Sequence, residues 1–367
     1  MKVPFLDLKS LNLRFEDAFA DALRRVLASG WFIQGQELAA FESEFAALCG
    51  VRHCIGVGNG LDALTLALRA WMELGRLSPG DEVIVPANTF IATALAVSQA
   101  GLTPVLADPD AETFNLSVDA AAAALSPRTR VLLPVHLYGR LADMAGLRQL
   151  ADAHGLLLLE DAAQAHGASI AGQAAGSFGD AAAFSFFPGK NLGALGDAGG
   201  VVTGDAALAA CIASLRSYGS SRKYHHDRQG VNSRLDELQA AFLRIKLQHL
   251  AGDVAARQAL AERYLAGIDN TQIKLPAKPV PGEQHAWHLF VVRSQDRDAL
   301  QGHLRDAGVE TLIHYPVPIH RQPAYAGTPW PALPVAEALA NSVLSLPLHP
   351  GLSDPQHVID ACNAFRP

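Results

Sequence analysis

The stretch from Phe184 to Gly200 reads FSFFPGKNLGALGDAGG and places one lysine on a turn directly after a short apolar segment. Residues 181–187 predict a buried strand, and Pro188-Gly189 ends it. Lys190 is then expected at the carboxyl edge of a sheet, where open α/β folds bind ligands. An ordinary solvated lysine is the alternative, since most lysines lie on the surface. This stretch alone leaves both interpretations open.

The composition predicts a globular protein with a large core. The chain has 367 residues, of which 50% are hydrophobic and 18% charged. A net charge of -7 gives no reason to expect nucleic acid or an anionic membrane as a partner. The four cysteines form no CxxC pair, and the first residues lack a signal-peptide pattern, so a reducing cytoplasm is expected. The most apolar run, residues 83–107, contains prolines and polar residues and is not expected to span a membrane.

Apolar strands alternate with helical segments along the first part of the chain. Strands are expected at 53–57, 82–86, 103–107, 130–135 and 156–160, and helices at 11–28, 37–49, 61–74, 91–99, 118–125 and 144–154. This alternation predicts an α/β fold with a mainly parallel sheet covered by helices on both faces.

The pattern of apolar residues after residue 234 predicts a second domain. A long helix at 235–268 is expected to link a large domain, residues 1–248, to a smaller α+β domain, residues 249–367. Strands are expected in the smaller domain at 287–293 and 309–314, with a helix at 297–307 between them.

A glycine turn lies between the first strand and the next helix. Gly58-Asn59-Gly60 would let backbone N–H groups face an anion at the helix N-terminus. The dinucleotide pattern GxGxxG is excluded, because Leu61 stands where its last glycine would be. A simple tight turn explains this segment equally well.

An acid follows the apolar segment 156–159. Asp161 would be either the N-cap of a following helix or a site residue at the carboxyl edge of the sheet. Because Lys190 follows the next strand, the two side chains could share one crevice.

Two further stretches allow more than one environment. Trp31-Phe32-Ile33 is expected to be core rather than the lip of a site. The polar, basic stretch 219–234 suits either an interface loop or a plain solvated loop. Within it, His225-His226-Asp227 is a poor pattern for metal ligands, and no metal site is expected.

Several motifs in order resemble one enzyme family over nearly the whole chain. The sequence is similar to the fold-type I pyridoxal-phosphate aminotransferases, and most closely to the DegT/DnrJ/EryC1 nucleotide-sugar aminotransferases. The motifs are FIQG at 32–35, GNGLDAL at 58–64, EDAAQAHG at 160–167, SFFPGKNLG at 185–193 and HYP at 314–316.

The resemblance assigns the two central chemical roles. Lys190 would hold pyridoxal 5'-phosphate as a Schiff base and then move the proton between the substrate carbon and the cofactor. Asp161 would face the pyridine nitrogen and keep it protonated, so that the ring accepts electrons.

The resemblance also implies how the cofactor is held. Gln164 would bond the phenolic oxygen, and Phe90 would stack on the ring opposite Ala163. Backbone N–H groups of Gly60 and Leu61 would bind the phosphate together with Ser185 and Asn232, the latter acting in the active site of a neighbouring subunit. A homodimer is therefore expected. Many relatives carry a hydroxyl residue at the Leu61 position, so only the backbone contribution is implied there.

The substrate implied is a dTDP-linked 3-keto-6-deoxyhexose that is aminated at C3, with L-glutamate as amino donor. Relatives acting on 4-keto sugars more often have histidine where this chain has Phe187, and several 3-keto enzymes have tyrosine there. A 4-keto sugar, a UDP-linked 3-keto sugar and a non-catalytic cofactor-binding regulator are the alternatives.

Three residues are candidates for sugar contacts: His166, His314 and Tyr315. For each histidine, a structural role in the core is equally compatible with the sequence. Arg222, Lys223 and Arg228 are candidates for binding the donor's carboxylate, and the sequence singles out none of them.

Overall fold

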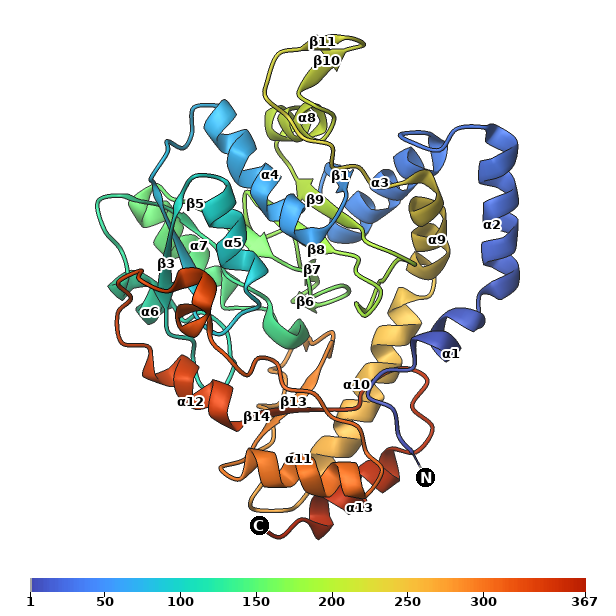
Figure 1. The fold of residues 1–367 in the computed structure, drawn as a ribbon, viewed down its shortest axis with the longest axis vertical. Coiled ribbons are helices and arrows are strands. Elements are labelled where there is room, and N and C mark those ends of the chain that lie inside the picture. The colour runs from blue at the N-terminus through green and yellow to red at the C-terminus, as the bar shows by residue number, and fades with distance from the viewer. Residues whose placement is uncertain (1) are drawn as a thin grey trace.

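A seven-stranded sheet forms the centre of the molecule in a computed structural model that describes residues 2–367 (Figure 1). The strand order is β1-β9-β8-β5-β4-β2-β3. The bounds are β1 His53–Val57, β9 Gly199–Thr203, β8 Ala181–Ser185, β5 Leu157–Asp161, β4 Thr129–Leu132, β2 Glu82–Pro86 and β3 Thr103–Ala107. β9 runs antiparallel to both neighbours, and the other pairs are parallel. The predicted mainly parallel α/β sheet is confirmed.

Helices cover both faces because successive strand residues point to opposite sides. Val83 and Val131 belong to the core on one face, whereas their neighbours Ile84 and Leu132 belong to the core on the other. The first face is covered by α4 (Gly60–Glu73), α5 (Ala92–Gln99) and α8 (Ala206–Leu215). The second is covered by α3 (Gln36–Cys49), α9 (Glu237–Leu247), α6 (Val118–Ala123) and α7 (Met144–His154).

Two long helices predicted from the sequence are each divided in the structure. The segment predicted at 11–28 forms α1 (Leu8–Leu13) and α2 (Glu16–Ser29), and that at 235–268 forms α9 and α10 (Leu250–Gly267). Phe15 leaves helical geometry at the first break, and at the second His249 N donates to Lys246 O (3.0 Å), a tighter turn than an α-helix. The rings of Phe15 and His249 lie 5.0 Å apart, so the two breaks pack against each other.

The C-terminal elements build a separate hydrophobic core. It contains residues of α10, β13 (Phe290–Arg293), α11 (Arg297–Asp306), β14 (Val343–Leu346) and α13 (Pro355–Ala364). β13 and β14 pair antiparallel. The strand predicted at 309–314 is wrong, because Val309 pairs only with Val3 and Leu312 only with Ser345, so no continuous ladder forms. The domain boundary between 248 and 249 stays a prediction.

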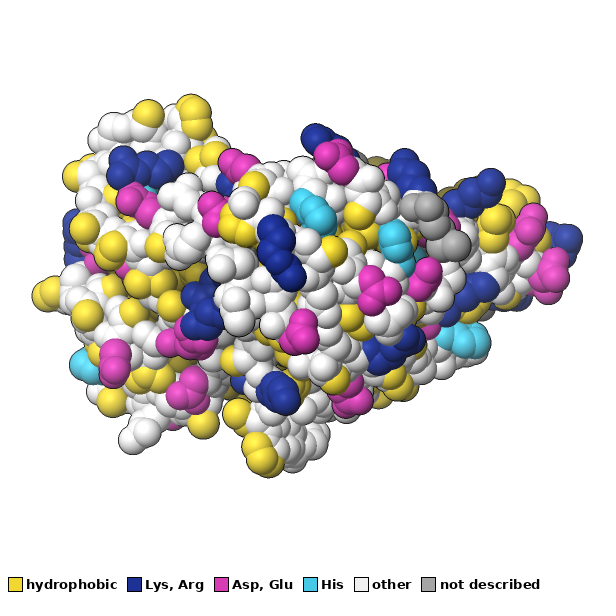
Figure 2. Space-filling model, turned by 90° about the horizontal axis from the view of Figure 1, so that it is seen from below, with side chains coloured by type: hydrophobic (Ala, Val, Ile, Leu, Met, Phe, Trp, Pro, Cys, Tyr) yellow, Lys and Arg dark blue, Asp and Glu magenta, His cyan; other side chains and the backbone are white. Residues whose placement is uncertain are grey.

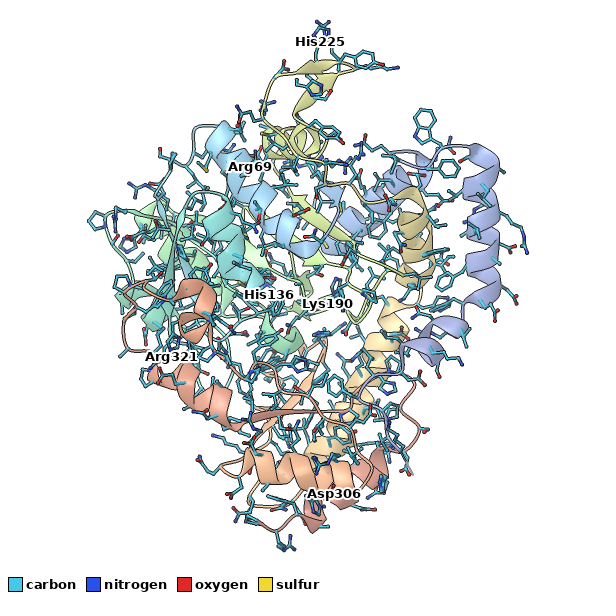
Figure 3. The ribbon with its side chains drawn as sticks, viewed as in Figure 1. Arg69, His136, Lys190, His225, Asp306 and Arg321 are labelled. Atoms are coloured by element: carbon cyan, nitrogen blue, oxygen red, sulfur yellow. The ribbon has the colours of Figure 1, made fainter. Side chains whose placement is uncertain are left out.

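The smaller elements lie around the sheet. They are β6 (Ser169–Ile170), β7 (Gln173–Ala174), β12 (Glu283–Gln284), α12 (Pro334–Ser342) and 3-10 turns at Leu137–Gly139, Ile319–Arg321 and Pro323–Tyr325. β10 (Ser220–Arg222) and β11 (His225–His226) form a hairpin that projects beyond α8 at the top of Figure 1, with His225 at its tip in Figure 3.

The molecular surface differs from the sequence-based expectation at one apolar turn. Trp31 is 61% exposed and Phe32 is 54% exposed, so the expected core position is wrong for both. On the face shown in Figure 2, acidic and basic side chains are interspersed rather than gathered by sign. Within residues 2–367, no helix has the length and apolar character needed to cross a bilayer.

Candidate active site

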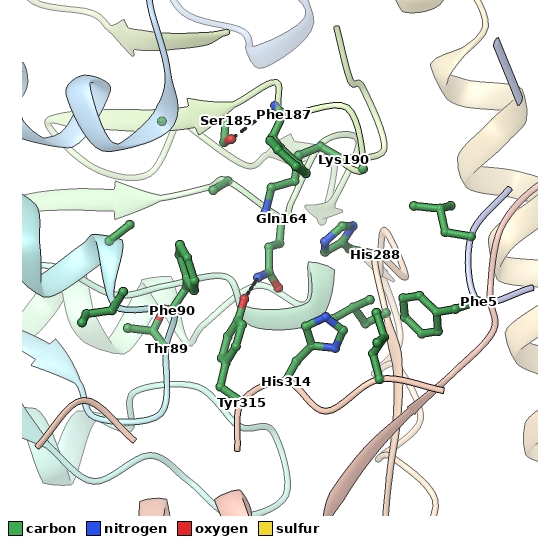
Figure 4. A pocket seen from close by; sticks show the side chains of 18 of the residues that line it. Phe5, Thr89, Phe90, Gln164, Ser185, Phe187, Lys190, His288, His314 and Tyr315 are labelled. Atoms are coloured by element: carbon green, nitrogen blue, oxygen red, sulfur yellow. Dashed lines mark hydrogen bonds between the residues drawn. The ribbon is translucent and has the colours of Figure 1, made fainter. Parts of the chain in front are cut away.

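Lys190 lies in the wall of a cavity of about 1210 Å³ near the middle of the molecule (Figures 3 and 4). The carboxyl ends of β5 and β8 reach this cavity through Asp161 and Ser185, and the N-terminus of α4 reaches it through Gly60. The C-terminal elements contribute His314 and further residues to the opposite wall. The sequence-based placement of Lys190 at the carboxyl edge of the sheet is therefore confirmed.

The amine of Lys190 is adapted to lose its proton. Burial lowers its pKa to about 8, although the nearby Asp161 carboxylate acts to raise it. At pH 7 roughly a tenth of such an amine is neutral, against less than about one part in a thousand for an unperturbed lysine. A neutral amine is the form that attacks a carbonyl or accepts a proton.

Asp161 is a buried carboxylate, and each of its two oxygens accepts a hydrogen bond. Thr93 Oγ1 donates to Oδ2 (2.9 Å), and Ala163 N donates to Oδ1 (3.2 Å). Burial raises the pKa of Asp161. No helix begins in residues 162–168, which form turns, so the N-cap alternative is excluded. A cation placed in the cavity against this carboxylate would stabilise its charged form.

Gln164 is held in one orientation by two neighbours. Its Oε1 accepts a hydrogen bond from Tyr138 N (2.6 Å), and its Nε2 donates to Tyr315 Oη (3.2 Å; Figure 4). The second proton on Nε2 remains for a ligand. Tyr315 lines the same cavity, and its ring centre lies 5.4 Å from that of Phe90.

Phe90 and Ala163 both line the cavity, and Phe90 is 52% exposed. A half-exposed aromatic ring in a cavity wall offers a stacking surface to a planar ligand.

The start of α4 forms an anion-binding corner. Asn59 caps the helix by accepting from Asp62 N (2.8 Å), which leaves the N–H groups of Gly60 and Leu61 without helical partners. A Cβ on Gly60 would lie 2.6 Å from Ser185 Cβ, so only glycine allows the helix this close to β8. Gly60, Leu61 and Ser185 all line the cavity. The geometry fits the phosphate-binding role implied by the sequence.

The three candidate sugar-binding residues are placed differently. His314 lines the cavity, where its Nδ1 lies 2.8 Å from Ser345 Oγ and burial lowers its pKa to about 4. His166 is 1% exposed, does not line the cavity and packs against Phe184 and Phe186. The geometry therefore favours the structural alternative for His166, while His314 and Tyr315 are in reach of a ligand.

Asn232 lies outside the cavity of its own subunit. It is exposed and pairs with Ser217 through an isolated bridge at the base of the β10–β11 hairpin. Its contribution to the site of a neighbouring subunit stays a prediction.

The sequence did not identify His288 as a residue of this cavity. His288 lies between Lys190 and His314 in Figure 4, and its Nδ1 lies 3.3 Å from Asn191 Oδ1. Asn191 Nδ2 donates to Ala286 O (2.8 Å), so its Oδ1 accepts and His288 Nδ1 carries the proton. His288 Nε2 is then a free acceptor. The only signal in the sequence was the position of Asn191 beside Lys190.

Thr93 and Phe5 were also not predicted from the sequence as residues of the site. Thr93 supports Asp161, and Phe5 enters the cavity wall from the N-terminal segment with its ring 5.8 Å from that of His314. Neither residue belongs to a motif, and both reach the site only through the tertiary fold.

The fold and the site define a pyridoxal-phosphate-dependent aminotransferase of fold type I, with a lysine, a buried carboxylate and an anion-binding corner around one cavity. Residues 14–364 match the DegT/DnrJ/EryC1/StrS aminotransferase family, and the chain belongs to that family.

Three curated relatives match nearly the whole chain. One is the erythromycin biosynthesis sensory transduction protein EryC1 of Saccharopolyspora erythraea, 54% identical over 356 residues, or 96% of each chain. Another is the dTDP-3-amino-3,4,6-trideoxy-alpha-D-glucose transaminase of Streptomyces venezuelae, 53% identical over 365 residues, covering 98% of this chain and 95% of the relative. The dTDP-3-amino-3,6-dideoxy-alpha-D-galactopyranose transaminase of Aneurinibacillus thermoaerophilus is 48% identical over 365 residues, or 99% of each.

Solved structures agree with this assignment. The crystal structure of S. venezuelae DesV superimposes with a TM-score of 0.95 and 52% identity, over 99% of this chain and 98% of that one. NtdA from Bacillus subtilis, solved with bound cofactor PMP, gives a TM-score of 0.90 and 34% identity, over 98% of this chain and 84% of that one.

Proposed function

We propose that the protein transfers an amino group to C3 of a dTDP-linked 3-keto-6-deoxyhexose, with L-glutamate as the amino donor. The observation that carries the proposal is the pairing of Lys190 with Asp161 in one cavity that also holds an anion-binding corner. Its volume of about 1210 Å³ exceeds the roughly 300–1,000 Å³ of ordinary small-ligand pockets, as a nucleotide-linked sugar requires. The names of two of the relatives support a dTDP-linked 3-amino product.

Lys190 performs the proton transfers in this proposal. Pyridoxal phosphate, when bound, supplies an electron sink for the carbon that loses a proton. The Lys190 amine first holds the cofactor and, once the donor's amine replaces it, is free to take the proton and return it elsewhere. Its pKa of about 8 suits both directions near neutral pH, because both protonation states are populated.

The other residues orient the reaction. Asp161 would hold a proton on the ring nitrogen through a charge-assisted hydrogen bond, and Thr93 and Ala163 fix the carboxylate for that purpose. Gln164, fixed by Tyr138 and Tyr315, would direct its free N–H to the phenolic oxygen.

Phe187 supports amination at C3 rather than C4. It lines the cavity beside the lysine turn and is 55% exposed. Relatives acting on 4-keto sugars more often carry histidine at this position, and an aromatic hydrocarbon cannot replace the hydrogen bonds of an imidazole. A hydroxyl contact from a tyrosine at this position is absent from this chain.

A homodimer in the cytoplasm is part of the proposal. Asn232 is exposed on a segment that would reach the phosphate of a neighbouring subunit's cofactor. Exposed aromatic side chains provide apolar area for such an interface: Trp31, Phe32 and Tyr218 are each at least 50% exposed. Sedimentation equilibrium of the purified protein tests this assembly, and a monomer would contradict it.

The substrate is tested by supplying purified protein and L-glutamate with dTDP-3-keto, dTDP-4-keto and UDP-3-keto sugars. We expect an amino product from the first, with nitrogen at C3.

The words "sensory transduction" in the name of EryC1 motivate a second candidate function, a cofactor-binding regulator without turnover. A cofactor spectrum that no amino donor changes would favour the regulator.

A further inference from the structure

A buried arginine borders the cavity that contains Lys190. Arg257, on α10, is 4% exposed and contributes to the same cavity wall. Its Nη1 donates to three backbone carbonyls, those of Trp287 (3.1 Å), His288 (3.3 Å) and Leu348 (2.8 Å). These bonds fix the guanidinium against the C-terminal elements.

The rest of the guanidinium has no partner in the described part of the chain. Nε is buried from solvent and makes no hydrogen bond. Nη2 also makes no hydrogen bond with residues 2–367, but it is accessible. Because the backbone carbonyls hold Nη1 and the residue lines the cavity, Nη2 is the nitrogen left for a ligand there.

The charge of Arg257 is not neutralised by a carboxylate. Among residues 2–367 no acid forms an ion pair with it. Asp253, one helical turn away, is instead engaged by both terminal nitrogens of Arg14. Burial lowers the pKa of Arg257 to about 10, with Asp253 acting to raise it, so the group is still charged at pH 7. A buried charge of this kind is costly unless an anion joins it.

Arg257 lies near the reacting amine rather than at the outer end of the cavity. Burial lowers the pKa of His288, and the charges of Lys190 and Arg257 each lower it further, so both cations lie near that imidazole. Both cations also border a second cavity of about 20 Å³ behind the lysine turn. A ligand anion on Arg257 is therefore close to the atom that undergoes chemistry at Lys190.

We propose that Arg257 binds the α-carboxylate of the amino-acid donor, an inference that rests on the proposed function. The α-carboxylate is bonded directly to the carbon that loses its proton to Lys190, so it must lie within a few ångströms of that amine. The diphosphate of a nucleotide sugar is attached at C1, two carbons away from the C3 that reacts. The one free nitrogen of the fixed guanidinium, Nη2, can donate a charge-assisted hydrogen bond to a carboxylate from a defined position, which a mobile ammonium cannot do.

This assignment differs from the candidates that the sequence offered. Arg222 and Lys223 are exposed at the β10–β11 hairpin and do not line this cavity, and Arg228 lies 3.6 Å from Glu73 in an ion pair. Arg257 was not predicted from the sequence, because it belongs to a helix that was expected only to connect the two domains.

The test separates the two halves of the reaction in the holoenzyme. The variants Arg257→Lys and Arg257→Gln are compared with wild type by rapid mixing, first with L-glutamate and then, in the amine form, with the keto sugar. We expect the dissociation constant for glutamate to rise about 10- to 100-fold in both variants, as loss of a charge-assisted hydrogen bond predicts. The keto-sugar half should change by less than about threefold. Arg263→Lys, an exposed position of the same helix, serves as matched control.

A donor series adds a readout that a purely structural role would not move. 4-Aminobutanoate lacks the α-carboxylate of glutamate, so the variants should react with it as wild type does. Equal losses in both half-reactions, or an unchanged glutamate constant, would overturn the assignment.

A crystal structure of the wild-type amine form with 2-oxoglutarate tests the contact without a variant. A carboxylate held by a residue other than Arg257 would overturn the assignment while leaving the aminotransferase function intact. If no amino acid changes the wild-type cofactor spectrum, the proposed function fails first.

Discussion

The residue before Asp161 offers a sharp test of how the active-site carboxylate is held in place. The carboxylate of Glu160 is fully buried and accepts four hydrogen bonds. Phe178 N and Gly179 N donate to Oε1 (2.8 and 2.7 Å), and Gly176 N and His136 Nε2 donate to Oε2 (2.8 Å each). His136 N in turn donates to the Asp161 carbonyl (3.0 Å), so the cluster supports the end of β5.

Glu160→Gln replaces one acceptor oxygen with a donor at nearly constant volume. The amide nitrogen would face two donors, whichever way the amide turns. His136 cannot adapt by moving its proton, because its Nδ1 accepts from Ala142 N (3.2 Å). Two buried donors lose their acceptor at about 1–3 kcal/mol each, so unfolding free energy should fall by about 2–6 kcal/mol.

Urea unfolding with and without cofactor measures this loss, and Glu262→Gln is the control. Glu262 is exposed on α10 and makes no ion pair or side-chain hydrogen bond with residues 2–367, so its replacement should change stability by less than about 0.5 kcal/mol. We also expect weaker cofactor binding by Glu160→Gln, because Asp161 loses its anchor. A Glu160→Gln protein within about 0.5 kcal/mol of wild type would refute this reasoning.

Three further predictions follow from the site. The rate at which apoprotein binds pyridoxal phosphate should rise with pH up to about 8 and then level off, because the neutral Lys190 amine is the reactive form. The variant Asp161→Asn removes the charge that raises the pKa of Lys190, so the midpoint of the pH profile should move lower. An unchanged midpoint in a pH series would contradict the pairing of Lys190 with Asp161. Gly60→Ala places a Cβ 2.6 Å from Ser185 Cβ and should weaken cofactor binding by about 1–3 kcal/mol, measured by fluorescence titration, whereas Gly252→Ala, with open space around it, should not. Lys190→Ala should abolish the visible absorbance of the lysine-bound cofactor, and a retained band would assign that role to another amine.

Much of the fold followed from the sequence because local pattern and final structure agree there. The strands ending at Asp161 and Ser185 are short apolar runs bounded by turn residues, and parallel strands bring their carboxyl ends to one edge. The break at His249 and the irregular segment at 309–314 could not be predicted in this way. Each depends on a contact with the N-terminal segment, through Phe15 and Val3.

The residues of the candidate site likewise fall into those that the sequence predicts and those that it does not. Lys190, Asp161 and Gly60 stand in motifs whose residue types reveal their chemistry. His288, Thr93 and Arg257 do not, because an ordinary residue gains its role only when the fold turns it toward the cavity. For His166 the structure favours the core role that the sequence had left open, because the rings of Phe184 and Phe186 pack against it.

The position of the new amino group on the sugar distinguishes the proposed reaction from its alternatives. Purified protein, pyridoxal phosphate and L-glutamate would be incubated with dTDP-3-keto-6-deoxyhexose and, separately, with the 4-keto isomer, and the products analysed by NMR. We expect an amine at C3 of the first sugar and no product from the second. An amine at C4, or turnover of the 4-keto sugar alone, would contradict it.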